Sequence, residues 1–215
     1  MSSSSSSQLE LSPPLLFTPS RHQSLLPAFA SLHISCITSP PNPILTFLPP
    51  VTPAKTKEID TWWQGRFNEV LEGTRHILFV ATLPKEGEEI RIAGVCMLST
   101  PKSETGPHRG FVEKFMVDPE FRGRGVGTGI MRMVEAVALE KGAWLLMLDT
   151  DVGSLGEGIY RRMGYIEYGR IPEYDVWSKT GELKTEIFFY KKLAQSEEGK
   201  ESVTGRKKQD VNELR

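Results

Sequence analysis

A glycine-rich turn between a strand-like run and a helix-like run limits the folds open to this chain more than any other feature. Residues 121–129 read FRGRGVGTG and follow an apolar run, 110–117, that ends at Asp118 and Pro119. Glycines permit positive φ angles and close backbone approach, so successive N–H groups can converge on an anion. The N-terminus of the helix expected over 127–141 adds partial positive charge. The turn therefore predicts a phosphate-bearing ligand where a strand leads into a helix.

Several known binding patterns compete for this turn. A dinucleotide-binding fingerprint needs G-x-G-x-x-G, and no register of the turn supplies the closing glycine. A P-loop needs a lysine followed by serine or threonine, and the turn contains no lysine. An Arg-Gly-Arg contact to a DNA minor groove is disfavoured because the whole chain has a net charge of −1. What remains is R-x-x-G-x-G, formed by Arg122, Gly125 and Gly127, with a flexible turn as the alternative.

The other apolar patterns switch between helix and strand periods along the chain. Residues 56–71 carry apolar side chains on one broad face, which indicates an amphipathic helix. Two β-type runs, 77–83 and 90–99, flank a polar turn and predict an antiparallel hairpin. Further helices are expected over 25–37, 127–141 and 154–163, and further strands over 110–117, 144–149, 165–170 and 185–192. This order predicts one α/β sandwich around a sheet with parallel and antiparallel pairs.

Length and composition fit one globular domain between two tails. The chain has 215 residues, of which 39% are hydrophobic and 25% charged, and its near-zero net charge argues against nucleic acid or an anionic membrane as partner. No apolar run approaches the ~20 residues of a membrane-spanning helix. The serine-rich start, 1–13, and the charged end, 194–215, are expected to be disordered and to flank a domain over 14–193. The two cysteines are expected to be reduced, and without a recognisable signal sequence a cytoplasmic location is predicted.

Two motifs taken together resemble those of the GNAT superfamily of acyl-CoA N-acyltransferases. The first is the strand before Asp118, the R-x-x-G-x-G turn and the helix after it. The second is Tyr160 followed by Gly164 and Tyr165, which is similar to the family's Tyr-x-x-x-Gly-Phe/Tyr segment. The resemblance implies the GNAT fold, an α/β single domain in which a mixed central β-sheet has helices on both faces.

The resemblance covers about residues 14–193, and residues 56–193 carry most of it. Shorter segments at 148–150, 171–174 and 189–191 resemble the tabtoxin-resistance type of acetyltransferase within the superfamily. The fold and the subgroup are thus separate expectations, because the subgroup rests on short motifs.

The resemblance implies acetyl-CoA as a co-substrate and assigns residues to it. The strand edge formed by Phe115, Met116 and Val117 would pair through its backbone with the pantetheine arm. Backbone N–H groups of the turn would bind the pyrophosphate. They belong to Arg122, Gly123, Arg124, Gly125, Val126, Gly127 and Thr128. Position 153 is glycine where many family members have an asparagine that contacts the cofactor, so this contact is expected to be absent.

Tyr160 is the candidate general acid. Acyl transfer to an amine requires a deprotonated nucleophile, a polarised thioester carbonyl and a proton for the leaving thiolate, and Tyr160 fits the last role. Ser154 and Glu157 have the spacing of a capping box that would begin the helix carrying Tyr160. Gly156 and Gly158 weaken this short helix, which the close approach of a ligand would explain. The alternative is a half-buried tyrosine with a structural role.

Two carboxylates are candidates for the base. Many GNAT enzymes carry a carboxylate six residues before the end of the strand, where this chain has Phe111. Glu113 lies two residues further along and faces the same side of the strand. In the tabtoxin-resistance-like pattern an Asp and a Tyr eleven residues later form the implied catalytic pair, and Asp149 and Tyr160 have that spacing. A cap or turn residue is the alternative reading of Asp149.

Together these patterns predict an acetyl-CoA-dependent N-acetyltransferase that transfers the acetyl group to a primary amine of a small molecule by direct attack in a ternary complex. One alternative is a protein acetyltransferase that acts on lysine or N-terminal amines. Another is a non-catalytic CoA-binding module of the same fold. Tyr160 beside an intact glycine turn favours the enzyme, whereas Phe111 argues against it. The patterns predict no metal and no oligomeric state.

Overall fold

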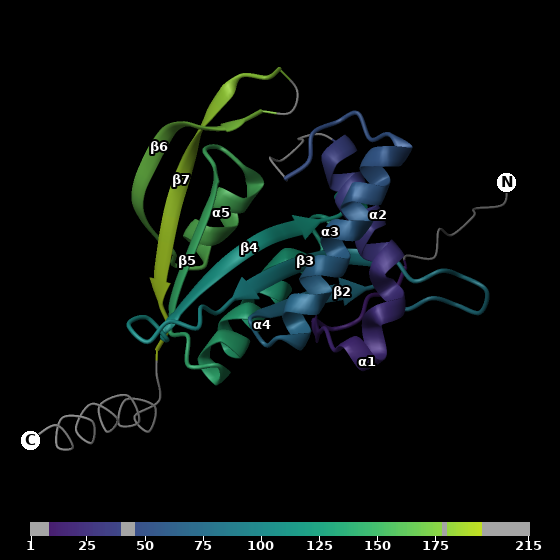
Figure 1. Cartoon of the computed structure of the whole chain (residues 1–215), viewed down its shortest axis with the longest axis horizontal. Helices are drawn as coiled ribbons and strands as arrows, with labels where there is room; N and C mark the ends of the chain where they lie inside the picture. The colour runs from purple at the N-terminus through teal and green to yellow at the C-terminus, as the bar shows by residue number, and fades with distance from the viewer. Residues whose placement is uncertain (1–8, 40–45, 178–179, 195–215) are drawn as a thin grey trace, which may run out of the picture.

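The computed structural model describes residues 9–39, 46–177 and 180–194, which contain a seven-stranded sheet (Figure 1). In spatial order the strands are β1 (Leu15–Leu16), β2 (Arg75–Ala81), β3 (Ile92–Ser99), β4 (Arg109–Val117), β5 (Leu145–Asp151), β7 (Leu183–Lys192) and β6 (Ile166–Val176). Neighbours β4 and β5 pair in parallel, and the other neighbouring pairs are antiparallel. The predicted mixed sheet is confirmed. Residues 1–8 and 195–215, most of the two expected tails, lie outside the described residues.

Helices cover both faces of the sheet, as the resemblance implied (Figure 1). They are α1 (Pro19–His22), α2 (Leu26–Thr38), α3 (Pro53–Leu71), α4 (Val126–Glu140) and α5 (Leu155–Arg162), with short 3₁₀ turns at Gln23–Leu25 and Pro119–Phe121. Alternate residues of a strand point to opposite faces, and this produces two hydrophobic cores. In β2, Leu78 packs in the core with α4 and α5, whereas Phe79 packs in the core with α2 and α3.

A bulge interrupts β4 in the middle of the strand. Val95 of β3 pairs with Met116 and Met97 pairs with Glu113, so β4 has one more residue than β3 over this stretch. Lys114 lies inside the bulge with a φ of 51°. An extra residue bends the strand that contains it, so the second half of β4 takes a new direction.

Beyond the bulge β4 and β5 part from one another. Within the described part of the chain they pair from Arg109 to Phe111, opposite the start of β5, and no further. The edge of β4 over 112–117 that faces away from β3 therefore has no strand partner. An unpaired strand edge presents backbone N–H and C=O groups to any ligand that can lie along it.

The residues just before β1 are ordered where disorder was expected. Leu11 forms an antiparallel bridge with Thr82, and the Ser12 N–H donates to the Ala81 carbonyl over 2.8 Å. This segment extends β1 along the outer edge of β2, whose backbone groups need partners. The structure thus places residues 11–12 beside β2, whereas the sequence had predicted disorder over 1–13.

Candidate active site

A cleft of about 1150 Å³ opens where β4 and β5 part. Its walls come from β4, the glycine turn, the start of α4, the end of β5, α5 and the β6–β7 hairpin. The predicted site residues that line it are Glu113, Phe115, Met116, Val117, Arg122, Gly123, Gly125, Val126, Gly127, Thr128, Asp149 and Tyr160. The structure thus brings the candidate catalytic residues and all the candidate cofactor residues except Arg124 into a single cavity.

The turn before α4 forms an open helix N-terminus at one end of this cleft. Gly125 is the N-cap residue with a φ of 79°, and no side chain caps the helix. A Cβ on Gly127 would lie 2.8 Å from Cζ of Phe115, so only glycine fits beside that ring. Uncapped N–H groups at the positive end of a helix dipole attract anions. The local geometry therefore suits the phosphate-bearing ligand expected from the sequence.

The two arginines of the turn have different roles in its structure. Arg122 lines the cleft, and its Nε donates to the Val117 carbonyl over 3.1 Å, which ties the turn to the end of β4. Arg124 is exposed and does not line the cleft, because its guanidinium lies over the Phe121 ring, 5.4 Å from the centroid. Of the two, only Arg122 lies where its charge can act on a ligand in the cleft.

Tyr160 is almost fully buried at the wall of the cleft, with 4% of its surface exposed. Its ring contacts Phe115 at 6.0 Å and Tyr165 at 5.8 Å between centroids. A Cβ on Gly156 would lie 3.3 Å from the Tyr160 ring, so this glycine leaves space for it one turn earlier in α5. Burial raises the pKa of Tyr160 well above its usual value, so the phenol keeps its proton at neutral pH.

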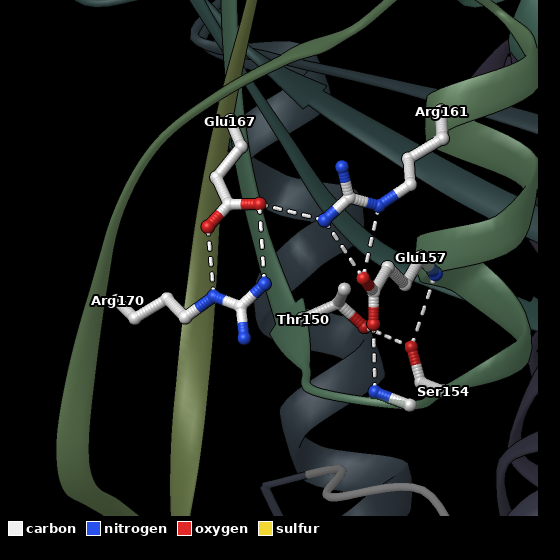
Figure 2. Close-up of polar contacts among 7 residues, drawn as sticks. Thr150, Ser154, Glu157, Arg161, Glu167 and Arg170 are labelled. Carbon is white, nitrogen blue, oxygen red and sulfur yellow. Dashed lines mark hydrogen bonds and ion pairs between the residues drawn. The ribbon is translucent and has the colours of Figure 1, made fainter.

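A capping box holds the start of α5, as the sequence predicted (Figure 2). The Glu157 N–H donates to Oγ of Ser154 over 3.1 Å, and Oγ1 of Thr150 lies 2.9 Å from the same hydroxyl. The Glu157 carboxylate accepts from the Gly153 N–H over 2.7 Å, one residue further back than in the usual box. These bonds connect the end of β5 to α5 and so position Tyr160 relative to Asp149.

Ion pairs connect the outer side of α5 to β6 (Figure 2). Arg161 donates to Glu157 over 2.9 Å and to Glu167 over 2.6 Å, and Arg170 donates to Glu167 over 2.7 Å. Exposed pairs of this kind contribute about 0–1 kcal/mol each, although shared partners make them act as a network. The network adds modestly to the attachment of α5.

Asp149 and Glu186 form a hydrogen-bonded pair of carboxyl groups in the cleft. Asp149 is accessible from the cleft, but the surrounding protein limits its hydration and raises its pKa, against the opposing effect of Lys114. Burial, with nearby Asp151 and Asp149, raises the pKa of Glu186 to about 8. At neutral pH the pair therefore shares one proton, with Glu186 as the protonated partner.

Glu113, the other candidate base, is held in an ion pair. Nη1 of Arg75 donates to its carboxylate over 2.6 Å, and Arg75 also pairs with Glu69. The ion pair directs this carboxylate toward Arg75. Of the two candidates, the geometry favours Asp149.

Neither cysteine has the properties of a nucleophile. Cys36 lies beside the cleft and Cys96 lies in the core, and both are buried and free of disulfide bonds. Burial raises the pKa of Cys36 to about 12 and also raises that of Cys96. Both thiols therefore stay protonated, and a thiolate mechanism has no support.

A family comparison agrees with this geometry. The sequence model of the acetyltransferase (GNAT) family matches residues 44–165, more than half of the chain. The chain belongs to this family. The matched region contains the glycine turn, Asp149 and Tyr160, so the family predicted from two motifs is confirmed. The tabtoxin-resistance subgroup is not confirmed.

One curated relative of this GNAT protein matches part of the chain by sequence. A rice protein, from Oryza sativa subsp. japonica, is described as probable glucosamine 6-phosphate N-acetyltransferase 2. It is 31% identical over 98 residues, which is 45% of this chain and 58% of that relative. The match thus spans little more than half of the relative's length.

Solved structures share the fold at lower identity. An N-acetyltransferase from Staphylococcus aureus Mu50 is 14% identical over 85% of this chain and all of that one, with a TM-score of 0.63. A ribosomal L7/L12 α-N-protein acetyltransferase in complex with coenzyme A is 12% identical over 80% of this chain and 90% of that one, with the same TM-score. These likenesses show the GNAT fold.

Sequence reasoning missed the residues that the β6–β7 hairpin adds to the cleft. They include Asp175, Lys184 and Glu186. The signal for Glu186 was a charged residue inside an apolar closing strand, which suggests a function when it is buried. The register that places it beside Asp151 depends on sheet pairing and was not visible in the sequence.

In the described structure no helix is both long and apolar enough to span a membrane.

Proposed function

We propose that this chain transfers an acetyl group from acetyl-CoA to the primary amine of a small molecule, by direct attack in a ternary complex. One observation carries the proposal: the uncapped N-terminus of α4, the unpaired edge of β4, Tyr160 and Asp149 all line the same cleft. A phosphate-bearing thioester needs an anion site and a strand edge, and an amine acceptor needs titratable groups near the reacting carbon.

The chain's own backbone fits acetyl-CoA. The first N–H groups of α4, from Val126 to Thr128, receive no side-chain cap and would bind the pyrophosphate. The backbone of Phe115 and Val117 would pair with the amide groups of the pantetheine arm. When bound, acetyl-CoA supplies a thioester whose carbonyl carbon accepts the amine. The similar L7/L12 acetyltransferase structure, which contains coenzyme A, supports this choice of co-substrate.

Asp149 and Tyr160 account for the protons of the reaction. An ammonium ion loses two protons on becoming an amide nitrogen. Asp149 takes the first, because its raised pKa makes it a stronger base than an ordinary aspartate. As the C–N bond forms and the C–S bond breaks, Tyr160 gives its proton to sulfur and receives the second nitrogen proton. The products are an amide, a thiol and one proton released to solvent from Asp149.

The shape of the acceptor end favours a small molecule. Trp177 and Lys184 of the β6–β7 hairpin line the cleft, and so do residues 46–48. An acceptor bound between these segments has little room to be part of an extended peptide. The rice relative, named for acetylation of an amino sugar phosphate, supports the same class.

Thiol release from acetyl-CoA, measured with a panel of primary amines and one lysine-containing peptide, tests the proposal. We expect release with small amines and much less with the peptide. Release with the peptide alone would support a protein acetyltransferase. Binding of acetyl-CoA without turnover of any acceptor would support a non-catalytic module instead.

A further inference from the structure

Glu186 is a buried acid at the acceptor end of the cleft. It lies in the middle of β7, opposite Asp151 of β5 and Ile171 of β6, and only 4% of its surface is exposed. It nevertheless lines the cleft. A glutamate is almost never this buried unless it has a partner, so its surroundings need an explanation.

The groups around Glu186 are mainly acidic. Asp149 and Asp151 come from β5 and Asp175 comes from β6, and all three raise the pKa of Glu186. On β4, Glu113 is paired with Arg75, and the nearby Tyr160 of α5 is neutral.

Among the described residues, two lysines lie at this end of the cleft. Lys114 of the β4 bulge offsets part of the negative charge at Asp149. Lys184 of β7 lies with its Nζ 3.9 Å from the centroid of the Trp177 ring. Among the described residues around Glu186, the carboxyl groups of Asp149, Asp151 and Asp175 stand beside these two lysines.

One oxygen of Glu186 has no hydrogen bond. Oε2 is buried and has no hydrogen-bond partner among the described residues, while the side chain is bonded to Asp149. A buried acceptor without a donor is unfavourable, because it has lost its hydrogen bonds to water. The nearest acidic side chains are acceptors when ionised, so they cannot satisfy it. A ligand that brings N–H groups and positive charge would.

We propose that Oε2 of Glu186, with the carboxylates of Asp149 and Asp175, forms the binding site for the acceptor amine in its ammonium form. This inference rests on the proposed function and deepens it by naming the substrate class. The acceptor is a cationic amine without an acidic group near the reacting nitrogen, because a second anion would meet the same carboxylates. A phosphorylated amino sugar therefore fits this cleft less well than a basic amine.

A pair of isosteres tests the charge requirement directly. Butylguanidine and butylurea have the same shape and both donate N–H groups, but only the guanidinium is charged, and it stays charged at all working pH values. Titration calorimetry on the full chain loaded with CoA should show butylguanidine binding at least about 10-fold more tightly than butylurea. Equal affinity would overturn the inference.

Substitution of Glu186 tests whether this residue forms the site. Glu186→Leu removes the oxygen and should raise the KM for an acceptor amine about 10-fold or more, with the Kd for CoA unchanged. Glu186→Gln keeps an acceptor oxygen and a donor toward Asp149, so it should bind butylguanidine like the wild type at pH 7. Above pH 8 the wild type should bind it more tightly as Glu186 ionises, and the Gln variant should gain less.

The outcomes separate this inference from the proposed function. Turnover with an unchanged KM in Glu186→Leu would overturn the ammonium site and leave the enzyme intact. An equal gain in affinity with pH in wild type and Glu186→Gln would also overturn it. If Glu186→Leu does not fold, the pH comparison with Glu186→Gln still decides. The absence of turnover with every amine would refute the proposed function, while the calorimetry would still test the site.

Substrate preference gives a further kinetic test. 1,5-Diaminopentane and 5-aminopentanoate carry the same reacting amine and differ in charge at the far end. We expect kcat/KM to be about 10-fold or more higher for the diamine, since like charges repel in a partly enclosed cleft. A preference for the amino acid would overturn the inferred substrate class.

Discussion

The two ends of the cleft are built from different parts of the chain. The anion end is main chain, from one continuous segment that runs from the end of β4 into α4. The acceptor end consists of side chains from β4, β5, α5, β6 and β7, which meet only in the folded protein. A main-chain site depends on the path of the backbone, and glycines fix that path. A side-chain site depends on burial and on the mutual charge of its members, so one substitution can change it.

The largest expected effect is at the acceptor end. Tyr160→Phe removes the hydroxyl and keeps the ring's packing, so kcat should fall by roughly 10²–10⁴-fold, the range for loss of a general acid. The Kd for CoA, measured by calorimetry, should stay within a few-fold, because the anion end is untouched. Tyr174→Phe, at a half-exposed position on β6, is the control and should turn over like the wild type. Near-normal kcat in Tyr160→Phe would make this tyrosine structural.

Gly125→Glu tests the other end. A side chain with negative charge at this positive-φ N-cap opposes a pyrophosphate, so CoA binding should be lost. In the wild type, CoA at roughly 100 Kd should add about 2.7 kcal/mol to the free energy of unfolding. Thermal unfolding with and without CoA measures the stabilisation of the wild type and its loss in Gly125→Glu.

The matched control for this variant is Gly87→Glu. That glycine also has a positive φ, 85°, and open space around it, in the loop between β2 and β3. It shares the backbone strain but lies away from the cleft, so CoA should still stabilise it. Stabilisation of Gly125→Glu by CoA would move the phosphate site elsewhere.

Glu186→Gln should stabilise the protein at alkaline pH. The pKa of Glu186 is about 8 in the folded protein and about 4.5 when unfolded, so wild-type stability falls as pH rises from 4.5 to 8. Glutamine does not ionise and avoids this loss. At pH 8.5 the variant should be more stable by at least about 1 kcal/mol, or about 2–4 °C in Tm.

Melting curves at pH 5 and pH 8.5 check this prediction. The difference between Glu186→Gln and the wild type should grow with pH, whereas Glu173→Gln, at an exposed position, should show none. A constant difference would mean that Glu186 does not titrate in this range.

The smallest expected effect concerns the N-terminal cap of α5. Ser154→Ala removes the hydroxyl that accepts from Glu157, which should cost about 1 kcal/mol of stability. Because α5 carries Tyr160, kcat should fall more than CoA affinity. Thr52→Ala removes the corresponding cap of α3, which lines no part of the cleft, and should cost similar stability without a loss of rate. Equal rate losses would argue against a positioning role for Ser154.

The sequence was informative wherever function depends on neighbouring residues. The turn at 121–129 and the cap at Ser154 were predicted from spacing, because each depends on local backbone geometry. The catalytic pairing of Asp149 with Tyr160 was implied by a resemblance and stays a prediction. The periods of helices and strands also predicted the mixed sheet. The structure of residues 9–13 was not expected, because it depends on pairing with the edge of β2 and on packing of Leu9 and Leu11 against the core.

The tertiary structure alone decided which side chains the candidate carboxyl groups contact. In the sequence, Glu113 and Asp149 were both candidates for the base. In the structure, Arg75 from β2 pairs with Glu113, and Glu186 from β7 pairs with Asp149. These partners are 38 and 37 residues away along the chain, respectively. The pKa of a carboxyl group depends on burial and on charges within a few ångströms. Such neighbours are chosen by strand order and register, which no local pattern in the sequence encodes.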